Sequence, residues 1–142
     1  MSGITAPKTL LAGPEQFLYG RLVRAFPGHV ILAQVALSRL LAGDSSTAAP
    51  GQPISNRCRH LVAGFVVCRP DFTVLAVVEL DEGAGARGTL RDRLRRKDQL
   101  LQAAGVKVVR FAAADIPREP ALRSLITALP MQGSAPQMRR AS

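Results

Sequence analysis

The chain has 142 residues, with 19 lysines and arginines against 10 aspartates and glutamates, and a formal net charge of +9. This length suits a single domain with one hydrophobic core, and no apolar run reaches the roughly 18 residues that a membrane span needs. A strongly basic surface attracts polyanions, so nucleic acid, with DNA first, is the expected partner, and a membrane is not. A solvated basic face without a partner is the alternative.

The two cysteines, Cys58 and Cys68, are too few for a disulfide framework and lack a metal-ligand spacing. Cys68 is best explained as a buried thiol in a strand. The first residues do not have the pattern of a secretory signal. Together these features favour a cytoplasmic protein in a reducing compartment.

Turn and cap signals divide the chain into the order α-β-β-β-α-β-α. Gly13-Pro14-Glu15 predicts the start of a helix, with glycine at the N-cap, and Pro27-Gly28 predicts its end. The other elements follow from apolar runs and their boundaries. They are a strand over 29–37, a helical turn over 38–42, a loop over 43–56, strands over 60–68 and 74–81, a loop over 82–88, a helix over 90–104 that Thr89 and Gly105 cap, a strand over 106–111 and a helix over 117–129.

This order predicts an α/β fold, in which a mixed sheet is flanked by helices. Residues 1–12 are expected to be a flexible lead-in, 13–129 the folded domain and 130–142 a disordered basic tail.

Paired carboxylates mark the end of the strand over 74–81. Side chains alternate along a strand, so Glu79 and Asp81 point to one face, where two carboxylates can share a hard cation. If the preceding strand places position 64 beside Glu79, that position faces the same site, and Gly64 offers no ligand there. The alternative for both carboxylates is a strand end that enters solvent. Asp71, between the strands, is most simply a turn residue.

Lys97 stands out in the basic helix because it shares the inward stripe with Leu90, Leu94 and Leu101. A lysine there either extends to an edge or meets a carboxylate, and near a phosphodiester its ammonium could stabilise developing charge. Glu15 lies on the inward stripe of the first helix, although an acidic residue in a first turn is also favoured by the helix dipole.

Five arginines are candidates for contacts with phosphate. Arg91 and Arg95 lie on the basic helix, Arg57 and Arg59 precede the strand that contains Gly64, and Arg110 ends the last strand. His60, at the start of the strand with Gly64, is more typical of a surface residue than of a ligand or base.

Several segments together are similar to a known family. They are Leu10-Leu11, Glu15, Pro27-Gly28-His29, the LAQVALSRLL run over 32–41, Phe65-Val66-Val67-Cys68, Glu79-Leu80-Asp81, Arg91-Asp92, Lys97-Asp98, Ala104-Gly105-Val106 and Arg110. Over residues 10–128 the chain resembles a bacterial domain of unknown function within the restriction-endonuclease-like PD-(D/E)xK superfamily. The α-β-β-β-α-β order is similar to the core of that superfamily.

The resemblance implies a Mg²⁺-dependent phosphodiesterase site with Glu79 as a metal ligand. The motif lysine would stand at position 81, which holds Asp81, so Lys97 would replace it from the helix. The metal-binding aspartate expected before Phe65 is Gly64, and a site with one anionic ligand fewer binds Mg²⁺ more weakly.

We therefore expect a nuclease-like domain that binds nucleic acid and has impaired metal-dependent hydrolysis. The first alternative is an active Mg²⁺-dependent endonuclease that uses Glu79, Asp81, Glu15 and Lys97. The second is a scaffold that binds protein and has no catalysis. The sequence does not identify the oligomeric state.

Overall fold

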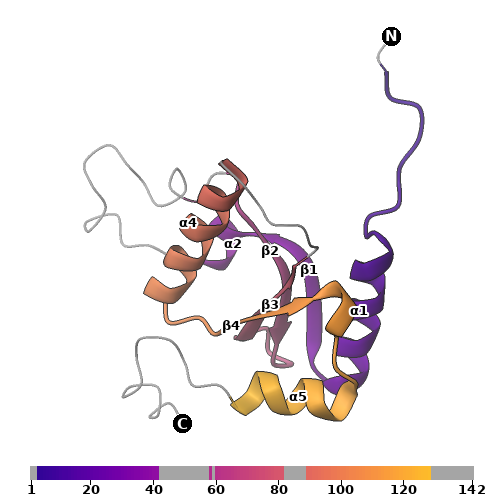
Figure 1. The fold of residues 1–142 in the computed structure, drawn as a ribbon, viewed down its shortest axis with the longest axis vertical. Coiled ribbons are helices and arrows are strands. Elements are labelled where there is room, and N and C mark those ends of the chain that lie inside the picture. Colours follow the sequence, from indigo (N-terminus) through magenta and orange to yellow (C-terminus); the bar gives the residue numbers. More distant parts are fainter. Residues whose placement is uncertain (1–2, 42–57, 59, 82–88, 129–142) are drawn as a thin grey trace.

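The elements and their order agree with the expectation from the sequence. The structure, a computed structural model, describes residues 3–41, 58, 60–81 and 89–128. Within them lie α1 (Gly13–Ala25), β1 (Val30–Ala36), α2 (Leu37–Leu40), β2 (Val62–Cys68), β3 (Val74–Asp81), α4 (Thr89–Ala103), β4 (Val108–Ala112), a 3₁₀ turn (Ala113–Asp115) and α5 (Glu119–Ala128) (Figure 1). The strand expected over 60–68 begins two residues later, and so do the last strand and the last helix. The predicted loops 43–56 and 82–88 and the tail 130–142 fall outside the described residues.

The strands form one mixed sheet in the order β1-β2-β3-β4. β1 pairs with β2 and β2 with β3 in antiparallel fashion, whereas β3 and β4 are parallel. Parallel neighbours need a crossover connection, and α4 lies in the chain between β3 and β4. The predicted α/β fold with a mixed sheet flanked by helices is confirmed.

Helices cover both faces of the sheet, so the strands are buried between two apolar clusters (Figure 1). Phe65 and Val67 of β2 join the cluster under α1 and α5, and Val66 and Cys68 join the one under α2 and α4. Both cysteines are free and buried, and burial raises the pKa of the Cys68 thiol. Cys68 is thus the buried strand thiol that the sequence indicated.

The helix boundaries follow from local hydrogen bonds. α1 begins one residue after its N-cap Ala12, not after Gly13 as expected, because the Glu15 carboxylate accepts a hydrogen bond from the Ala12 N–H at 2.8 Å. At the C-terminal end of α4, Gly105 adopts a left-handed φ of 75°. Its N–H donates to Gln102 O at 2.9 Å and the Val106 N–H donates to Leu101 O at 3.0 Å, which together form a Schellman cap.

Asp71 belongs to the turn between β2 and β3. Its carboxylate accepts hydrogen bonds from the backbone N–H of Thr73 at 3.0 Å and from the Thr73 hydroxyl at 2.7 Å. These bonds lower the pKa of Asp71. The turn role predicted for Asp71 is confirmed, and the turn lies at the opposite end of β2 and β3 from Gly64 and Glu79.

Candidate functional site

Strand pairing places Gly64 beside Glu79. β2 and β3 pair Phe65 with Val78, so the next two positions along the strands are 64 and 79. The Gly64 N–H donates to Glu79 Oε2 over 3.4 Å, and a Cβ at position 64 would lie 3.2 Å from Glu79 Oε1. Any side chain at this position would therefore point at the Glu79 carboxylate. Position 64 thus faces the predicted site, as expected if the two strands pair in this register.

The carboxylate of Glu79 meets the ammonium of Lys97. Lys97 Nζ lies 3.1 Å from Glu79 Oε2, and the two side chains are only 10% and 9% exposed. The ammonium also donates to the Val62 carbonyl at 3.0 Å. α4 thus turns Lys97 inward, as its place on the apolar stripe predicted, and Lys97 meets a carboxylate instead of extending to an edge. Each buried charge therefore has polar partners: the ammonium has a carboxylate and a carbonyl, and the carboxylate has the ammonium and the Gly64 N–H.

Gln34 also belongs to the site and is not among the site residues predicted from the sequence. β1 pairs Ala33 with Phe65 and Val35 with Ala63, so Gln34 lies opposite Gly64. Its φ of 55° is left-handed, which is uncommon for a residue other than glycine. The one signal in the sequence was a single amide within the apolar run VILAQVA of β1.

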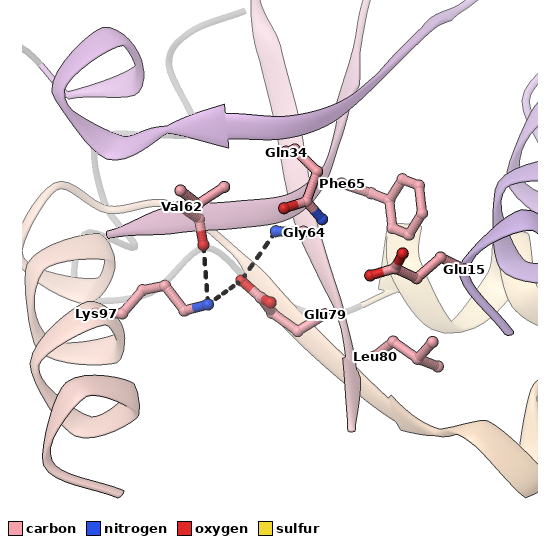
Figure 2. A pocket seen from close by; sticks show the side chains of 8 residues that line it. All are labelled: Glu15, Gln34, Val62, Gly64, Phe65, Glu79, Leu80 and Lys97. Carbon is pink, nitrogen blue, oxygen red and sulfur yellow. Dashed lines mark hydrogen bonds and ion pairs between the residues drawn. The ribbon is translucent and has the colours of Figure 1, made fainter. Parts of the chain in front are cut away.

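These residues line a pocket of about 140 Å³ (Figure 2). Its lining consists of Glu15, Gln34, Val62, Gly64, Phe65, Glu79, Leu80 and Lys97. Figure 2 shows the polar groups converging from four elements: Lys97 from α4, Glu15 from α1, Gln34 from β1 and Glu79 from β3. Three of the four predicted catalytic residues, Glu15, Glu79 and Lys97, thus line one pocket, although one carboxylate oxygen of Glu15 also caps α1.

Asp81, the fourth predicted residue, does not line this pocket. It is exposed at the last position of β3, opposite Ala112 of β4. Of the proposed metal pair, the pocket therefore holds only Glu79.

Arg110 lies opposite Glu79 in the parallel pairing of β3 with β4. Its guanidinium contacts the Asp98 carboxylate through two hydrogen bonds, at 3.2 and 3.1 Å. The bond to Asp98 raises the pKa of Arg110, and the charges of Asp98, Glu79 and Asp81 act in the same direction, against the opposing effect of burial. Arg110 thus ties β4 to α4, and part of its hydrogen-bonding capacity is already used.

Four arginines project from α4 into solvent. They are Arg91, Arg93, Arg95 and Arg96. Within the described residues none of them has an ion pair or a side-chain hydrogen bond. Arg57 and Arg59, the other two predicted phosphate contacts, lie outside the described residues, and His60 is exposed.

The donor set in the pocket does not fit a divalent-cation centre. Among the described residues no group of three or more His, Cys, Asp or Glu side chains is placed to hold a metal ion. Position 64 supplies no oxygen, and Lys97 already contacts Glu79 Oε2. A hard cation prefers several oxygen ligands, and here one oxygen of the Glu79 carboxylate is already paired with an ammonium.

The fold and the pocket define an α/β domain with a buried acid–lysine pair at one end of its two central strands. Residues 7–129 match the family described as "Protein of unknown function (DUF2726)", and the chain belongs to this family. The expected membership in a family of unknown function is thus confirmed.

Neither a curated protein nor a solved structure matches the chain significantly. Across the described residues, no helix has both the length and the apolar character to cross a membrane.

Proposed function

We propose that this chain is a nuclease-like domain that binds nucleic acid and has impaired metal-dependent hydrolysis of phosphodiesters. The observation that carries the proposal is the buried pair of Glu79 and Lys97, 3.1 Å apart, which faces Gly64 across the ends of β2 and β3. An acid on a central strand with a lysine beside it is what the PD-(D/E)xK resemblance leads one to expect, although here the lysine comes from α4. The order α-β-β-β-α-β agrees with that resemblance.

Impaired hydrolysis is proposed because of the oxygens that the pocket lacks. A metal-dependent phosphodiesterase needs a cation that activates water and neutralises charge on the phosphate. A carboxylate at position 64 would lie next to Glu79 and complete a pair of acidic ligands, but Gly64 leaves Glu79 with an ammonium neighbour. The residues that remain can bind and orient a ligand without holding the cation that the reaction requires.

Binding of nucleic acid is supported by the charge distribution. The net charge of +9 comes with an excess of arginine on the outer surface of α4, the helix that also delivers Lys97 to the pocket. Arginines without acidic partners are available to phosphate oxygens. A phosphate backbone that follows α4 would pass beside the pocket.

The binding half of the proposal is tested by fluorescence anisotropy with labelled single- and double-stranded DNA and RNA, from about 50 to 200 mM salt. Affinity should fall steeply with salt. Arg91→Ala with Arg95→Ala should weaken binding and make the salt slope shallower by roughly one unit or more, because each lost phosphate contact contributes about 0.7 to 0.9.

The matched control is Arg69→Ala with Arg118→Ala, which removes the same number of charges from exposed positions that are not part of α4. Equal losses in the two double variants would mean that net charge acts without a defined surface. Absence of any salt-dependent binding by the wild type would reject the proposal and favour the protein-binding scaffold.

The catalytic half is tested with the wild type, Glu79→Gln and Gly64→Asp, by calorimetric titration with Mn²⁺ and by cleavage of plasmid and single-stranded DNA with Mg²⁺ or Mn²⁺. The wild type should neither bind Mn²⁺ tightly nor cleave. Gly64→Asp should gain Mn²⁺ binding, provided that the Glu79 carboxylate shifts by the few tenths of an ångström that the 3.2 Å contact demands. Wild-type cleavage that Glu79→Gln abolishes would establish the active endonuclease instead.

A further inference from the structure

We infer that the pocket receives one unpaired nucleobase, and that Gln34 recognises the hydrogen-bonding edge of that base. The inference rests on the proposed function, because it assumes that the chain binds nucleic acid. The ligand of the pocket would then be a nucleobase, and Gln34 would determine which base is preferred.

The backbone at Gln34 directs this side chain into the pocket. Residues two apart on a regular strand share a face, but Ala33 packs in the cluster under α1 and α5, and Val35 packs in the cluster under α2 and α4. The left-handed φ of 55° at Gln34 accounts for the change of face between them. This conformation is unfavourable for a residue with a Cβ, and glycine would adopt it freely.

Gly64 is the neighbour of Gln34 across the sheet. The two residues lie opposite each other in the pairing of β1 with β2, and both line the pocket. Figure 2 shows the carboxamide of Gln34 pointing into the pocket close to Gly64. A side chain at position 64 would enter the pocket against the Glu79 carboxylate.

Two hydrogen-bonding groups of the pocket are unused within the described residues. The carboxamide of Gln34 has no partner there, although it offers two N–H donors and a carbonyl acceptor. Glu79 uses Oε2 for Lys97 and for the Gly64 N–H, whereas no described residue donates a hydrogen bond to Oε1. A ligand that offers an amino group beside a ring nitrogen can bind both groups.

The charges of the pocket favour a base over a phosphate. Glu15 and Glu79 are formally negative and Lys97 is formally positive, so the lining carries one net negative charge. A phosphate would be repelled there, whereas the exposed arginines of α4 attract it. The volume of about 140 Å³ is close to the roughly 150 Å³ of a cavity that holds a benzene ring, so it has room for one six-membered ring, either that of cytosine or the pyrimidine ring of adenine.

Bases that carry an exocyclic amino group fit best. Glutamine carboxamides bind the amino group and ring nitrogen of adenine, and carboxylates accept from the amino group of cytosine. Thymine has no such amino group, and its N3–H donor lies between two carbonyl oxygens that would face the Glu79 carboxylate. Single strands expose these edges, since their bases are not paired.

The test compares labelled oligothymidine 12-mers that carry one central adenine, cytosine or thymine, bound to the full-length chain at one fixed salt concentration. The wild type should bind the adenine or cytosine oligomer at least about fivefold more tightly than the all-thymine one. Gln34→Gly should remove most of this preference. Because glycine suits the left-handed backbone, this variant should melt no lower than the wild type.

Gln34→Asn is the second variant, since asparagine tolerates the left-handed conformation and keeps a carboxamide; it should retain part of the preference. Gln99→Ala, which removes an exposed carboxamide of α4 outside the pocket, should retain all of it. Equal binding of the three oligomers by the wild type, or an unchanged preference in Gln34→Gly, would overturn the inference and leave the proposed function standing. Failure of the wild type to bind these oligomers would overturn the inference, and failure to bind double-stranded DNA and RNA as well would overturn both.

Discussion

At the scale of single residues, the ion pair between Lys97 and Glu79 is the most sensitive part of the molecule. Both side chains are almost fully buried, and the ammonium is the partner of the carboxylate. Such a pair need not stabilise the fold relative to apolar residues, because both charges lose their hydration. Loss of one member is costly, because the other charge then stays buried without compensation.

Lys97→Ala should therefore lower the free energy of unfolding by about 3–5 kcal/mol, measured by urea denaturation. Glu79→Gln combined with Lys97→Met removes both charges and should recover a large part of this loss. If Lys97→Ala costs less than about 1 kcal/mol, the value typical of an exposed pair, the buried ion pair described above is not present in solution.

A second buried lysine shows how one residue links two elements. Lys107 precedes β4, is 6% exposed, and donates from Nζ to the Ile126 carbonyl at 3.1 Å in the last turn of α5. The helix dipole and this bond favour the ammonium. Burial acts against it and, with a smaller contribution from the positive charge of Arg69, lowers the pKa of Lys107 below its ordinary value of 10.5.

This shift makes stability depend on pH at the alkaline end. Because the pKa of Lys107 is lower in the folded state, burying its charged form costs folding free energy at low pH. This cost disappears as the pH rises from the folded-state pKa towards 10.5. The wild type should therefore gain stability relative to Lys107→Met over this window, measured by urea denaturation at several pH values. Lys8→Met, at an exposed position, is the control and should show no such trend; a flat difference for Lys107→Met would contradict the prediction.

At the scale of elements, glycines at two kinds of position should respond to alanine in opposite ways. Gly105 has a φ of 75° in the cap of α4, where a Cβ is strained, so Gly105→Ala should cost about 1–2 kcal/mol. Gly20 lies inside α1, where a Cβ would meet the flexible end of Arg24 at 3.3 Å, and Gly20→Ala should gain up to about 1 kcal/mol. Thermal denaturation of both variants checks the signs. A gain in Gly105→Ala would mean that α4 does not end in this cap.

At the scale of the whole molecule, the sheet couples two apolar clusters. Val66 and Val67 are neighbours in β2, both fully or almost fully buried, but they pack on opposite faces. Val66→Ala and Val67→Ala should each cost about 1–3 kcal/mol. Because the clusters share the strands, each variant should still unfold in one transition.

The measurement is chemical denaturation followed by far-ultraviolet circular dichroism and by hydrogen exchange of amides on both sides of the sheet. Leu125→Ala, at a position that is 47% exposed, is the control and should change stability by no more than about 0.5 kcal/mol. Two separate transitions in either valine variant would show that the two faces fold independently.

Charge is also a property of the whole molecule. The excess of lysine and arginine gives a net charge of +9 from composition alone, but composition does not say where the charges lie. The fold places Arg91 and Arg95 on the outer surface of α4 and commits the guanidinium of Arg110 to Asp98. Of the described arginines predicted to bind phosphate, those on α4 are therefore the better candidates.

The sequence by itself determined the elements and their order, because caps, turns and apolar periodicity act over a few residues. Pro27-Gly28 after α1, Asp71 in the hairpin and Gly105 after α4 have these roles for local reasons. The same periodicity predicted that Lys97 faces the sheet, because a helix distributes side chains around its axis in a regular way.

Tertiary structure alone decided which side chains share the pocket. Pairing between distant segments brings Gln34, Gly64 and Glu79 side by side, and no local pattern in the sequence predicts the left-handed backbone at Gln34. It also separated Asp81 from Glu79: both were expected at one site by strand alternation, but Asp81 lies one pleat farther along β3, beyond the pocket lining. Strand register and the reach of each side chain depend on contacts between elements, and periodicity within one element does not contain that information.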